Sequence, residues 1–156
     1  MNKKSGFTLI EVLTVVIILG ILTAAALPQY RKVIKRAEAA NALTNVKAIF
    51  DSAKRFKMSR SAWPTAVNQL DVELLDVGED GTMGEFQYTF SPNDGGIVSA
   101  CRLSNGASSA NTYCLEAHYR RNNIRDVYTC RYSNSRFQDI CESLGTNCTN
   151  SVCIIQ

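Results

Sequence analysis

The chain has 156 residues, which is enough for one domain with a single hydrophobic core. Its formal net charge is +3 at pH 7, and removal of a leader that contains Lys3 and Lys4 would lower that charge by two. This balance excludes the strongly basic footprint typical of a nucleic-acid-binding protein, so no specific nucleic-acid partner is expected.

The most informative stretch is the apolar segment between Gly6 and Pro28. As an α-helix that rises about 1.5 Å per residue, it would span about 31 Å, close to the thickness of a bilayer core. Glu11 is its only ionisable residue, and a carboxylate in hydrocarbon costs on the order of 3 kcal/mol unless it has a partner. Because the segment contains no basic residue, we expect the partner of Glu11 to come from elsewhere.

The residues Lys3-Lys4-Ser5-Gly6-Phe7-Thr8-Leu9-Ile10-Glu11 resemble the class III leader junction of type IV prepilins, with the short basic leader of the type IVa kind. The resemblance implies that a prepilin peptidase, which is also an N-methyltransferase, cuts after Gly6 and methylates the new amino group of Phe7. It places the family's acid, the fifth residue of the mature chain, on Glu11, and its helix-interrupting pair on Gly20 and Pro28. Beyond Pro28 the chain is similar to the family in layout only.

Cleavage after Gly6 would create an α-amino group shortly before Glu11, with both charges in apolar surroundings. An unpaired ion is expensive there, whereas a paired ion is tolerated. Within one rigid helix the two groups are poorly placed to neutralise each other, but they can pair between two staggered copies. Glu11 is therefore predicted to set the register of identical subunits in a helical filament.

A second interpretation of the N-terminus rests on Ala24-Ala25-Ala26, which fits an ordinary signal-peptidase site. Cleavage there would release a soluble secreted domain that begins at Leu27. The apolar run is longer than the usual signal-peptide core of about 7–15 residues and contains an acid, which favours the prepilin interpretation. N-terminal sequencing would distinguish methylated Phe7 from Leu27.

Residues 29 to about 60 are predicted to continue the helix, because apolar residues recur at three- and four-residue spacing. We expect a kink or break at Pro28, which removes a backbone hydrogen bond, with Gly20 weakening the helix further. The predicted core-facing positions are Tyr30, Val33, Ala37, Ala40, Leu43, Val46, Phe50, Ala53 and Phe56. The basic residues Arg31, Lys32, Lys35 and Arg36 are expected at the lipid headgroups, or beside acids of neighbouring subunits after assembly.

From Glu85 the apolar period changes to two, which predicts strands at 85–90, 97–103, 112–119 and 125–132. Consecutive strands with short loops favour an antiparallel meander that buries one face on the helix 29–60. The predicted fold class is α+β: a long, kinked N-terminal helix whose second half packs on a roughly four-stranded antiparallel sheet, the ladle shape of pilins. The predicted divisions are a leader at 1–6, a transmembrane and filament-core segment at 7–28, and a globular domain at 29–156.

All six cysteines follow residue 100, which indicates disulfides formed in an oxidising compartment. Six cysteines allow 15 pairings, and we predict the sequential set Cys101–Cys114, Cys130–Cys141 and Cys148–Cys153. The family commonly has one C-terminal disulfide, so three depart from its pattern. In a bacterium these bridges place the domain outside the inner membrane and the N-terminus in the cytoplasm.

Catalytic motifs are not evident in the sequence. His118 is the only histidine and has no partner at an obvious spacing, and neither a G-x-S-x-G elbow nor a P-loop is present. The acids between Asp71 and Asp80 do not follow the spacing of a calcium loop. We therefore predict no enzyme activity, no metal and no cofactor.

The predicted function is that of a structural subunit of a type IV pilus, held in the inner membrane as a prepilin and then polymerised at the cell surface. Its expected partners are further copies of itself, the prepilin peptidase, and an assembly motor and platform. The alternatives are a pseudopilin of a type II secretion system, a minor tip pilin and a membrane-anchored monomeric adhesin.

Overall fold

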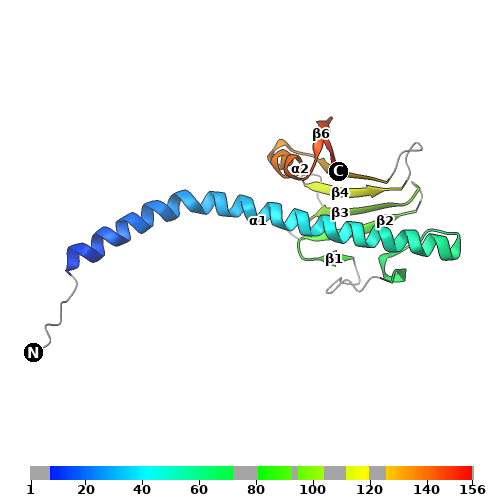
Figure 1. Ribbon diagram of the computed structural model, residues 1–156, viewed down its shortest axis with the longest axis horizontal. Coiled ribbons are helices and arrows are strands. Elements are labelled where there is room, and N and C mark those ends of the chain that lie inside the picture. The colour runs from blue at the N-terminus through cyan, green and yellow to red at the C-terminus, as the bar shows by residue number, and fades with distance from the viewer. Residues whose placement is uncertain (1–7, 72–80, 93–94, 104–111, 120–125, 156) are drawn as a thin grey trace, which may run out of the picture. The chain divides into compact units, whose positions relative to one another are not determined.

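The computed structural model of the chain describes residues 8–71, 81–92, 95–103, 112–119 and 126–155. The elements in the first half are α1 (Leu9–Arg60), the 3-10 helix η1 (Val67–Gln69), β1 (Thr82–Met83), β2 (Phe86–Ser91) and β3 (Ile97–Arg102). They are followed by β4 (Tyr113–His118), β5 (Val127–Tyr132), the 3-10 helix η3 (Ser135–Phe137), α2 (Gln138–Leu144), β6 (Thr146–Thr149) and β7 (Val152–Ile155). The described elements confirm the α+β fold class, with a long N-terminal helix before an antiparallel sheet (Figure 1).

The chain divides into two compact units, Met1–Ala37 and Glu38–Gln156, and the boundary falls inside α1. In the first unit, α1 is continuous through Gly20 and Pro28. The break considered at these residues is therefore not seen in the structure. Pro28 removes one backbone hydrogen bond, and the alanines and leucine before it are strong helix formers that maintain the helix around that loss.

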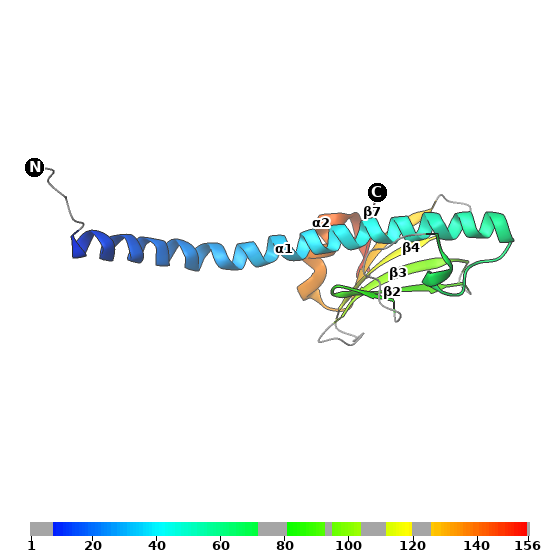
Figure 2. The same cartoon turned by 90° about the horizontal axis from the view of Figure 1, so that it is seen from below.

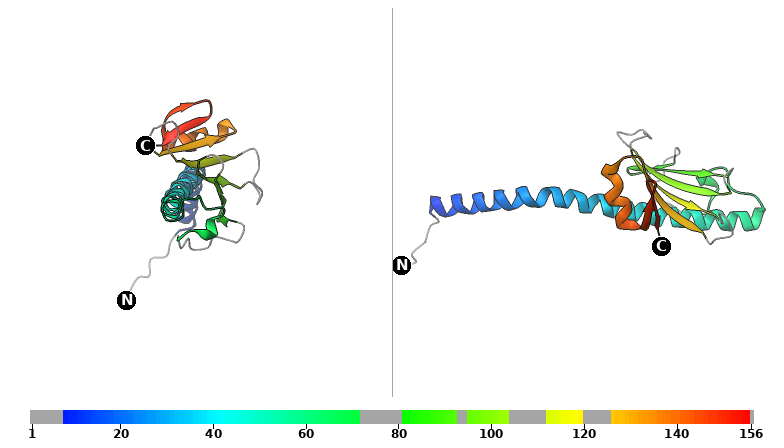
Figure 3. Two further views of the ribbon diagram at one scale, coloured as in Figure 1. Left: turned by 90° about the vertical axis from the view of Figure 1, so that its right-hand side faces the viewer. Right: turned by 90° about the horizontal axis from the view of Figure 1, so that it is seen from above.

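The second unit contains a sheet with the strand order β1-β2-β3-β4-β5-β7-β6, and each neighbouring pair is antiparallel. The consecutive strands β2 to β5 are the meander expected from the alternating pattern. Figures 2 and 3 show these strands on one side of the part of α1 that belongs to this unit. The sheet is larger than the expected four strands, because β1, β7 and β6 extend it at its two edges.

Two of the added strands come from the C-terminal tail, whose polar sequence did not indicate a hairpin. β6 and β7 are joined by a tight turn in which Asn150 and Ser151 have positive φ angles of 49° and 63°. The sequence signal for this turn is weak, because asparagine tolerates positive φ but serine, in place of the usual glycine, seldom adopts it. β7 then pairs with β5, so that Val152–Ile155 lies between β5 and β6.

The core of the second unit forms where α1 meets the inner face of the sheet. Residues Val46, Ile49 and Phe50 of α1 are fully buried, and the ring of Phe50 lies edge-on to Tyr128 with 6.1 Å between centroids. The buried apolar residues of the sheet are Phe86, Tyr88, Val98, Ala100, Tyr113, Leu115, Ala117, Cys130, Cys153 and Ile155. The prediction that Tyr30, Val33, Ala37 and Ala40 face the core is wrong, because all four are exposed. The first three belong to the first unit, in which no described residue is buried, and in the second unit Ala39 and Ala42 are buried instead of Ala40.

Three disulfides join the sheet to itself and to α2. Cys101 and Cys114 link β3 to β4, Cys130 and Cys141 link β5 to α2, and Cys148 and Cys153 link β6 to β7. The structure thus brings together the same three pairs that were predicted from the sequence. The C-terminal region is cross-linked at every described element from β3 onward except η3.

Candidate functional site

The most unusual surface of the chain is the first unit, where apolar side chains face outward in all directions. The large apolar residues between Leu9 and Leu27 expose from 50% to 85% of their surface. α1 is the single described helix that is long and apolar enough to cross a membrane. No part of its most apolar 18-residue stretch is buried. A continuous apolar surface of this extent marks a site that contacts lipid or protein.

The threonines of this segment do not present unpaired hydroxyl groups to their surroundings. Thr14 Oγ1 donates a hydrogen bond to the carbonyl oxygen of Glu11 at 3.0 Å, and Thr23 Oγ1 donates to that of Leu19 at 2.7 Å. Such back-bonding satisfies a hydroxyl within its own helix. Apart from Glu11, the surface from Leu9 to Leu27 is consequently apolar in effect as well as in composition.

Glu11 caps the start of α1. Its Oε2 accepts hydrogen bonds from the backbone N–H of Thr8 at 2.8 Å and from Thr8 Oγ1 at 2.7 Å, while Glu11 N–H donates to Thr8 Oγ1 at 3.3 Å. This reciprocal arrangement is a capping box, in which the side chains of the first and fourth residues satisfy unpaired N–H groups of the first turn. The T-x-x-E spacing of Thr8 and Glu11 is visible in the sequence and indicates this local role, beside the predicted pairing of Glu11 with another subunit.

The structure describes some of the other residues predicted for this site and not others. Gly6 and Phe7 lie outside the described residues. Gly20 lies in α1 with open space around it, since a Cβ there would meet nothing within 4 Å. Beyond the apolar segment, Arg31, Lys32, Lys35 and Arg36 are all exposed on α1, so the apolar surface is followed directly by a basic one.

A separate polar cluster lies on the outer face of the sheet. His118 Nε2 is 3.2 Å from Glu116 Oε2 and 3.3 Å from Thr129 Oγ1, and the guanidinium of Arg131 donates to Glu116 Oε1. His118 therefore has partners, although none was expected from the sequence. Glu116 precedes it by two residues, and alternate residues of a strand share a face. Burial raises the pKa of Glu116, but hydrogen bonding to His118 and the charge of Arg131 lower it to a net value below the ordinary 4.5.

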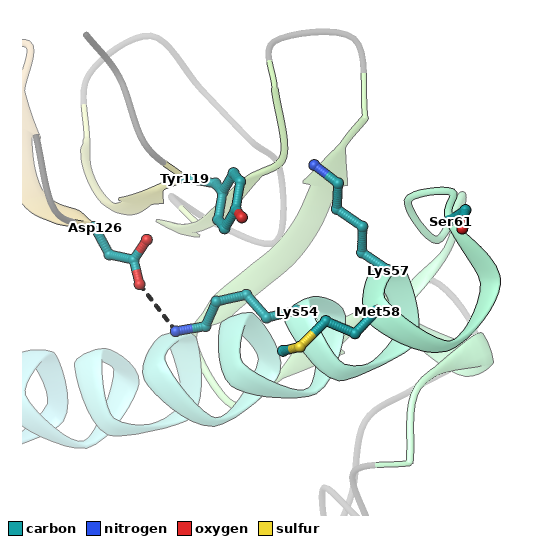
Figure 4. Close-up of a pocket in the computed structure, with 6 residues that line it drawn as sticks. All are labelled: Lys54, Lys57, Met58, Ser61, Tyr119 and Asp126. Atoms are coloured by element: carbon teal, nitrogen blue, oxygen red, sulfur yellow. Dashed lines mark hydrogen bonds and ion pairs between the residues drawn. The ribbon is translucent and has the colours of Figure 1, made fainter. Parts of the chain in front are cut away.

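A shallow pocket of about 650 Å³ lies beside the C-terminal turns of α1, lined by Lys54, Lys57, Met58, Ser61, Tyr119 and Asp126 (Figure 4). The ammonium of Lys54 lies 3.0 Å from Asp126 and 2.6 Å from Asp51. Lys57 Nζ lies 4.2 Å from the ring centroid of Trp63 and 4.5 Å from that of Tyr119. These contacts hold both lysines within the domain, and the lining side chains do not form a nucleophile–base pair.

The exposed apolar helix and the disulfide-bonded α+β unit together define a pilin-like subunit. Residues 1–27 match the family model of the prokaryotic N-terminal methylation motif. The chain is 35% identical over 120 residues to type II secretion system core protein G of Vibrio cholerae, covering 66% of this chain and 82% of that protein. It is 29% identical over 138 residues to a fimbrial protein of Pseudomonas aeruginosa, covering 84% and 87%. The match to type IV major pilin protein PilA of Myxococcus xanthus is 37% over 68 residues, covering 44% of this chain and 31% of that protein.

The chain belongs to the family of type IV pilins and type II secretion pseudopilins, and it carries a class III leader. This is a family of structural subunits and not a family of enzymes. Within the family, the relatives include both pilins and a secretion-system core protein.

Proposed function

We propose that the chain is a structural subunit of a type IV pilus, polymerised through its N-terminal helix. The observation that supports this proposal is the apolar surface of Leu9–Leu27, whose large residues are all at least half exposed. Covering one such side chain contributes about 1.5–3 kcal/mol, so a monomer in water is unfavourable. A bilayer covers this surface before assembly, and the same segments of other copies cover it in the filament.

In this role the chain consists of a leader at 1–6, a membrane and filament-core segment at 7–28, and a globular domain at 29–156. A prepilin peptidase cuts between Gly6 and Phe7 and methylates Phe7. The precursor crosses the inner membrane once with its N-terminus in the cytoplasm, and the disulfides form on the other side. Extraction from the bilayer costs tens of kcal/mol by area, which requires an assembly motor and a platform. Gly20 and Pro28 are the positions where α1 would unwind during packing.

In the filament, the carboxylate of Glu11 pairs with the amino group of Phe7 from another copy. Each ion is poorly tolerated alone in an apolar bundle, and the pair is formed only at the correct axial stagger. The capping box does not conflict with this role, because one Glu11 oxygen, Oε2, makes both described hydrogen bonds to Thr8. Oε1 makes no hydrogen bond among the described residues, which leaves it available to a second group.

The test separates the charge of Glu11 from its capping role. Glu11→Gln removes the charge, but glutamine also completes a capping box, whereas Thr8→Val removes the two capping contacts of Thr8 Oγ1 and keeps the charge. We expect Glu11→Gln to reduce sheared surface filaments strongly and Thr8→Val to leave most of them, with both precursors cut and methylated normally by mass spectrometry. Normal filament yield from Glu11→Gln, or an equal loss in both variants, would reject the registration role.

A second candidate function is that of a type II secretion pseudopilin. It is favoured by the similarity to the core protein of Vibrio cholerae, which covers most of that protein. The three disulfides and the wider coverage of the Pseudomonas aeruginosa fimbrial protein favour the pilus. Abundance of the chain in a sheared surface fraction supports a pilus, and its retention in the cell envelope with impaired protein secretion on deletion supports the pseudopilin.

A further inference from the structure

We infer that the two C-terminal disulfides form an exchange pair, in which Cys153 can take the place of Cys141 as the partner of Cys130. In the observed state Cys130 is bonded to Cys141 of α2, and Cys153 is bonded to Cys148 of β6. Yet Cys130 and Cys153 occupy directly opposed positions in the β5–β7 pair. Two residues that oppose each other across a strand pair project from the same face of the sheet.

The register brings these two cysteines within bonding range. The backbone N–H of Tyr132 donates to the carbonyl oxygen of Ser151 at 3.0 Å, which makes Tyr132–Ser151 a hydrogen-bonded pair. Pairs of this class recur every second residue and include Cys130–Cys153, with Cα atoms about 5.5 Å apart. Disulfides usually join Cα atoms about 4.4–6.8 Å apart, so a Cys130–Cys153 bond requires little movement of the backbone.

Burial sets the order in which the bonds react. Cys130, Cys141 and Cys153 are fully buried, whereas Cys148 is only partly buried. An external dithiol therefore meets the Cys148 sulfur first. Its thiolate attacks that sulfur, the Cys148–Cys153 bond breaks, and Cys153 leaves as a thiolate. The second thiol of the reagent then releases Cys148 as a thiol, and the dithiol becomes a disulfide.

The Cys153 thiolate then attacks the sulfur of Cys130. A Cys130–Cys153 bond forms, the Cys130–Cys141 bond breaks, and Cys141 leaves as a thiolate that takes up a proton. The number of protein disulfides falls by one, which matches the oxidation of one dithiol. The outcome is that β5 is linked to β7 while α2 loses its covalent link to the sheet.

The Cys101–Cys114 bond is the internal control for this chemistry. These two cysteines oppose each other in the β3–β4 pair, and their other cross-strand neighbours are Gln87 and Arg131. A thiol released at Cys101 therefore has no second disulfide beside it in the described sheet. Exchange is expected at the C-terminal pair of bonds and not at this one.

The experiment uses the full chain in detergent with Cys148→Ser, which leaves Cys153 without its partner. The protein is quenched in acid, unfolded, alkylated, and digested with trypsin and a glutamate-specific protease. Arg131, Arg136 and Glu142 then place Cys130, Cys141 and Cys153 on different peptides. We expect a Cys130–Cys153 cross-linked peptide, with the alkyl label divided between Cys141 and Cys153. Label confined to Cys153, with Cys130–Cys141 as the sole bridge of Cys130, would overturn the inference.

Cys114→Ser is the matched control, and its label should stay on Cys101 with both C-terminal bridges unchanged. If Cys148→Ser does not fold, the test is a time course of reduction of the unaltered chain by dithiothreitol under native conditions. The Cys130–Cys153 peptide should appear, with Cys141 and Cys148 alkylated, before all bridges are reduced. Loss of each original bridge without this species would also overturn the inference.

Discussion

Gly95 and Gly96 share a backbone conformation but have different surroundings. Their φ angles are 81° and 87°, in the left-handed region. A Cβ on Gly96 would lie 2.5 Å from Cζ2 of Trp63, whereas a Cβ on Gly95 would meet nothing within 4 Å. The indole of Trp63 thus lies directly on Gly96, and it also contacts the rings of Phe90 and Tyr119. Alanine substitution at the two sites therefore separates backbone strain from side-chain packing.

We predict that Gly95→Ala lowers the free energy of unfolding by about 1–2 kcal/mol, the cost of a left-handed non-glycine residue. Gly96→Ala should cost about 1–3 kcal/mol more, because the tryptophan must also move. Urea unfolding of the full chain in detergent, followed by tryptophan fluorescence, measures both values. Equal losses in the two variants would show that Trp63 does not pack on Gly96.

Glu116 gives the second unit a specific pH dependence. Its net pKa in the folded chain lies below the ordinary value of 4.5. The ionised carboxylate is therefore bound more favourably in the folded state, and this stabilisation is present above about pH 4.5 and lost as pH falls through the folded pKa. Nearby groups that titrate or carry charge on this face are His118 and Arg131.

We predict that the thermal midpoint of the unaltered chain falls more steeply between about pH 5 and about pH 3 than that of Glu116→Gln. The difference between the two curves isolates Glu116 from other carboxylates, including Asp71, whose pKa the Arg55 side chain lowers to about 2. Circular dichroism of the sheet in detergent provides the readout. Parallel curves would mean that Glu116 is not preferentially stabilised as an ion in the folded chain.

At the scale of elements, the orientation of α1 is the feature most open to a direct test. Ala39 is fully buried, whereas the neighbouring Ala40 is exposed. We predict that Ala39→Leu destabilises the second unit by about 1–3 kcal/mol, because the closely packed core has no room for the added methylenes. Ala40→Leu should change stability by less than about 0.5 kcal/mol. Chemical unfolding of the two variants gives the comparison, and a reversed order would mean that α1 presents its other face to the sheet.

The same helix shows how far the sequence could predict the fold. Three- and four-residue spacing correctly indicated a long amphipathic helix with Leu43, Val46, Phe50 and Ala53 in the core. It did not resolve the phase at the alanines, because alanine occurs on both faces and its small side chain carries little hydrophobic signal. Strands β2 to β5 were predictable from their alternation, whereas β1 and β6, at the sheet edges, are too short to show a clear alternating pattern.

Some features of the candidate site could likewise be predicted from the sequence, and others could not. Glu11 is conspicuous in sequence because its charge conflicts with the apolar segment. Its contact with Thr8 follows from local spacing and could have been predicted, as could the alignment of Glu116 with His118 on one strand face. The opposition of Cys130 and Cys153 could not, because it depends on the register between β5 and β7, strands separated in sequence by α2 and β6.

At the scale of the whole molecule, the two units differ in whether they contain a buried core. No residue from 8 to 37 is buried, and the first buried side chain is that of Ala39. The first unit therefore contributes apolar surface to its surroundings, whereas the second contains a core and three disulfides of its own. Solubility and folding should consequently depend on different parts of the chain.

We predict that a chain starting at residue 29 folds in water without detergent, sediments as a monomer and keeps a cooperative thermal transition. It loses the apolar surface of Leu9–Leu27 but none of the buried residues. A chain starting at Lys47 is the control, because it also loses Leu43 and Val46 from the core, and truncation of buried aliphatic residues costs about 2–5 kcal/mol each. That control should unfold without a cooperative transition. If the chain from residue 29 also fails to fold, or aggregates in water, the first unit must contribute to the folding of the second.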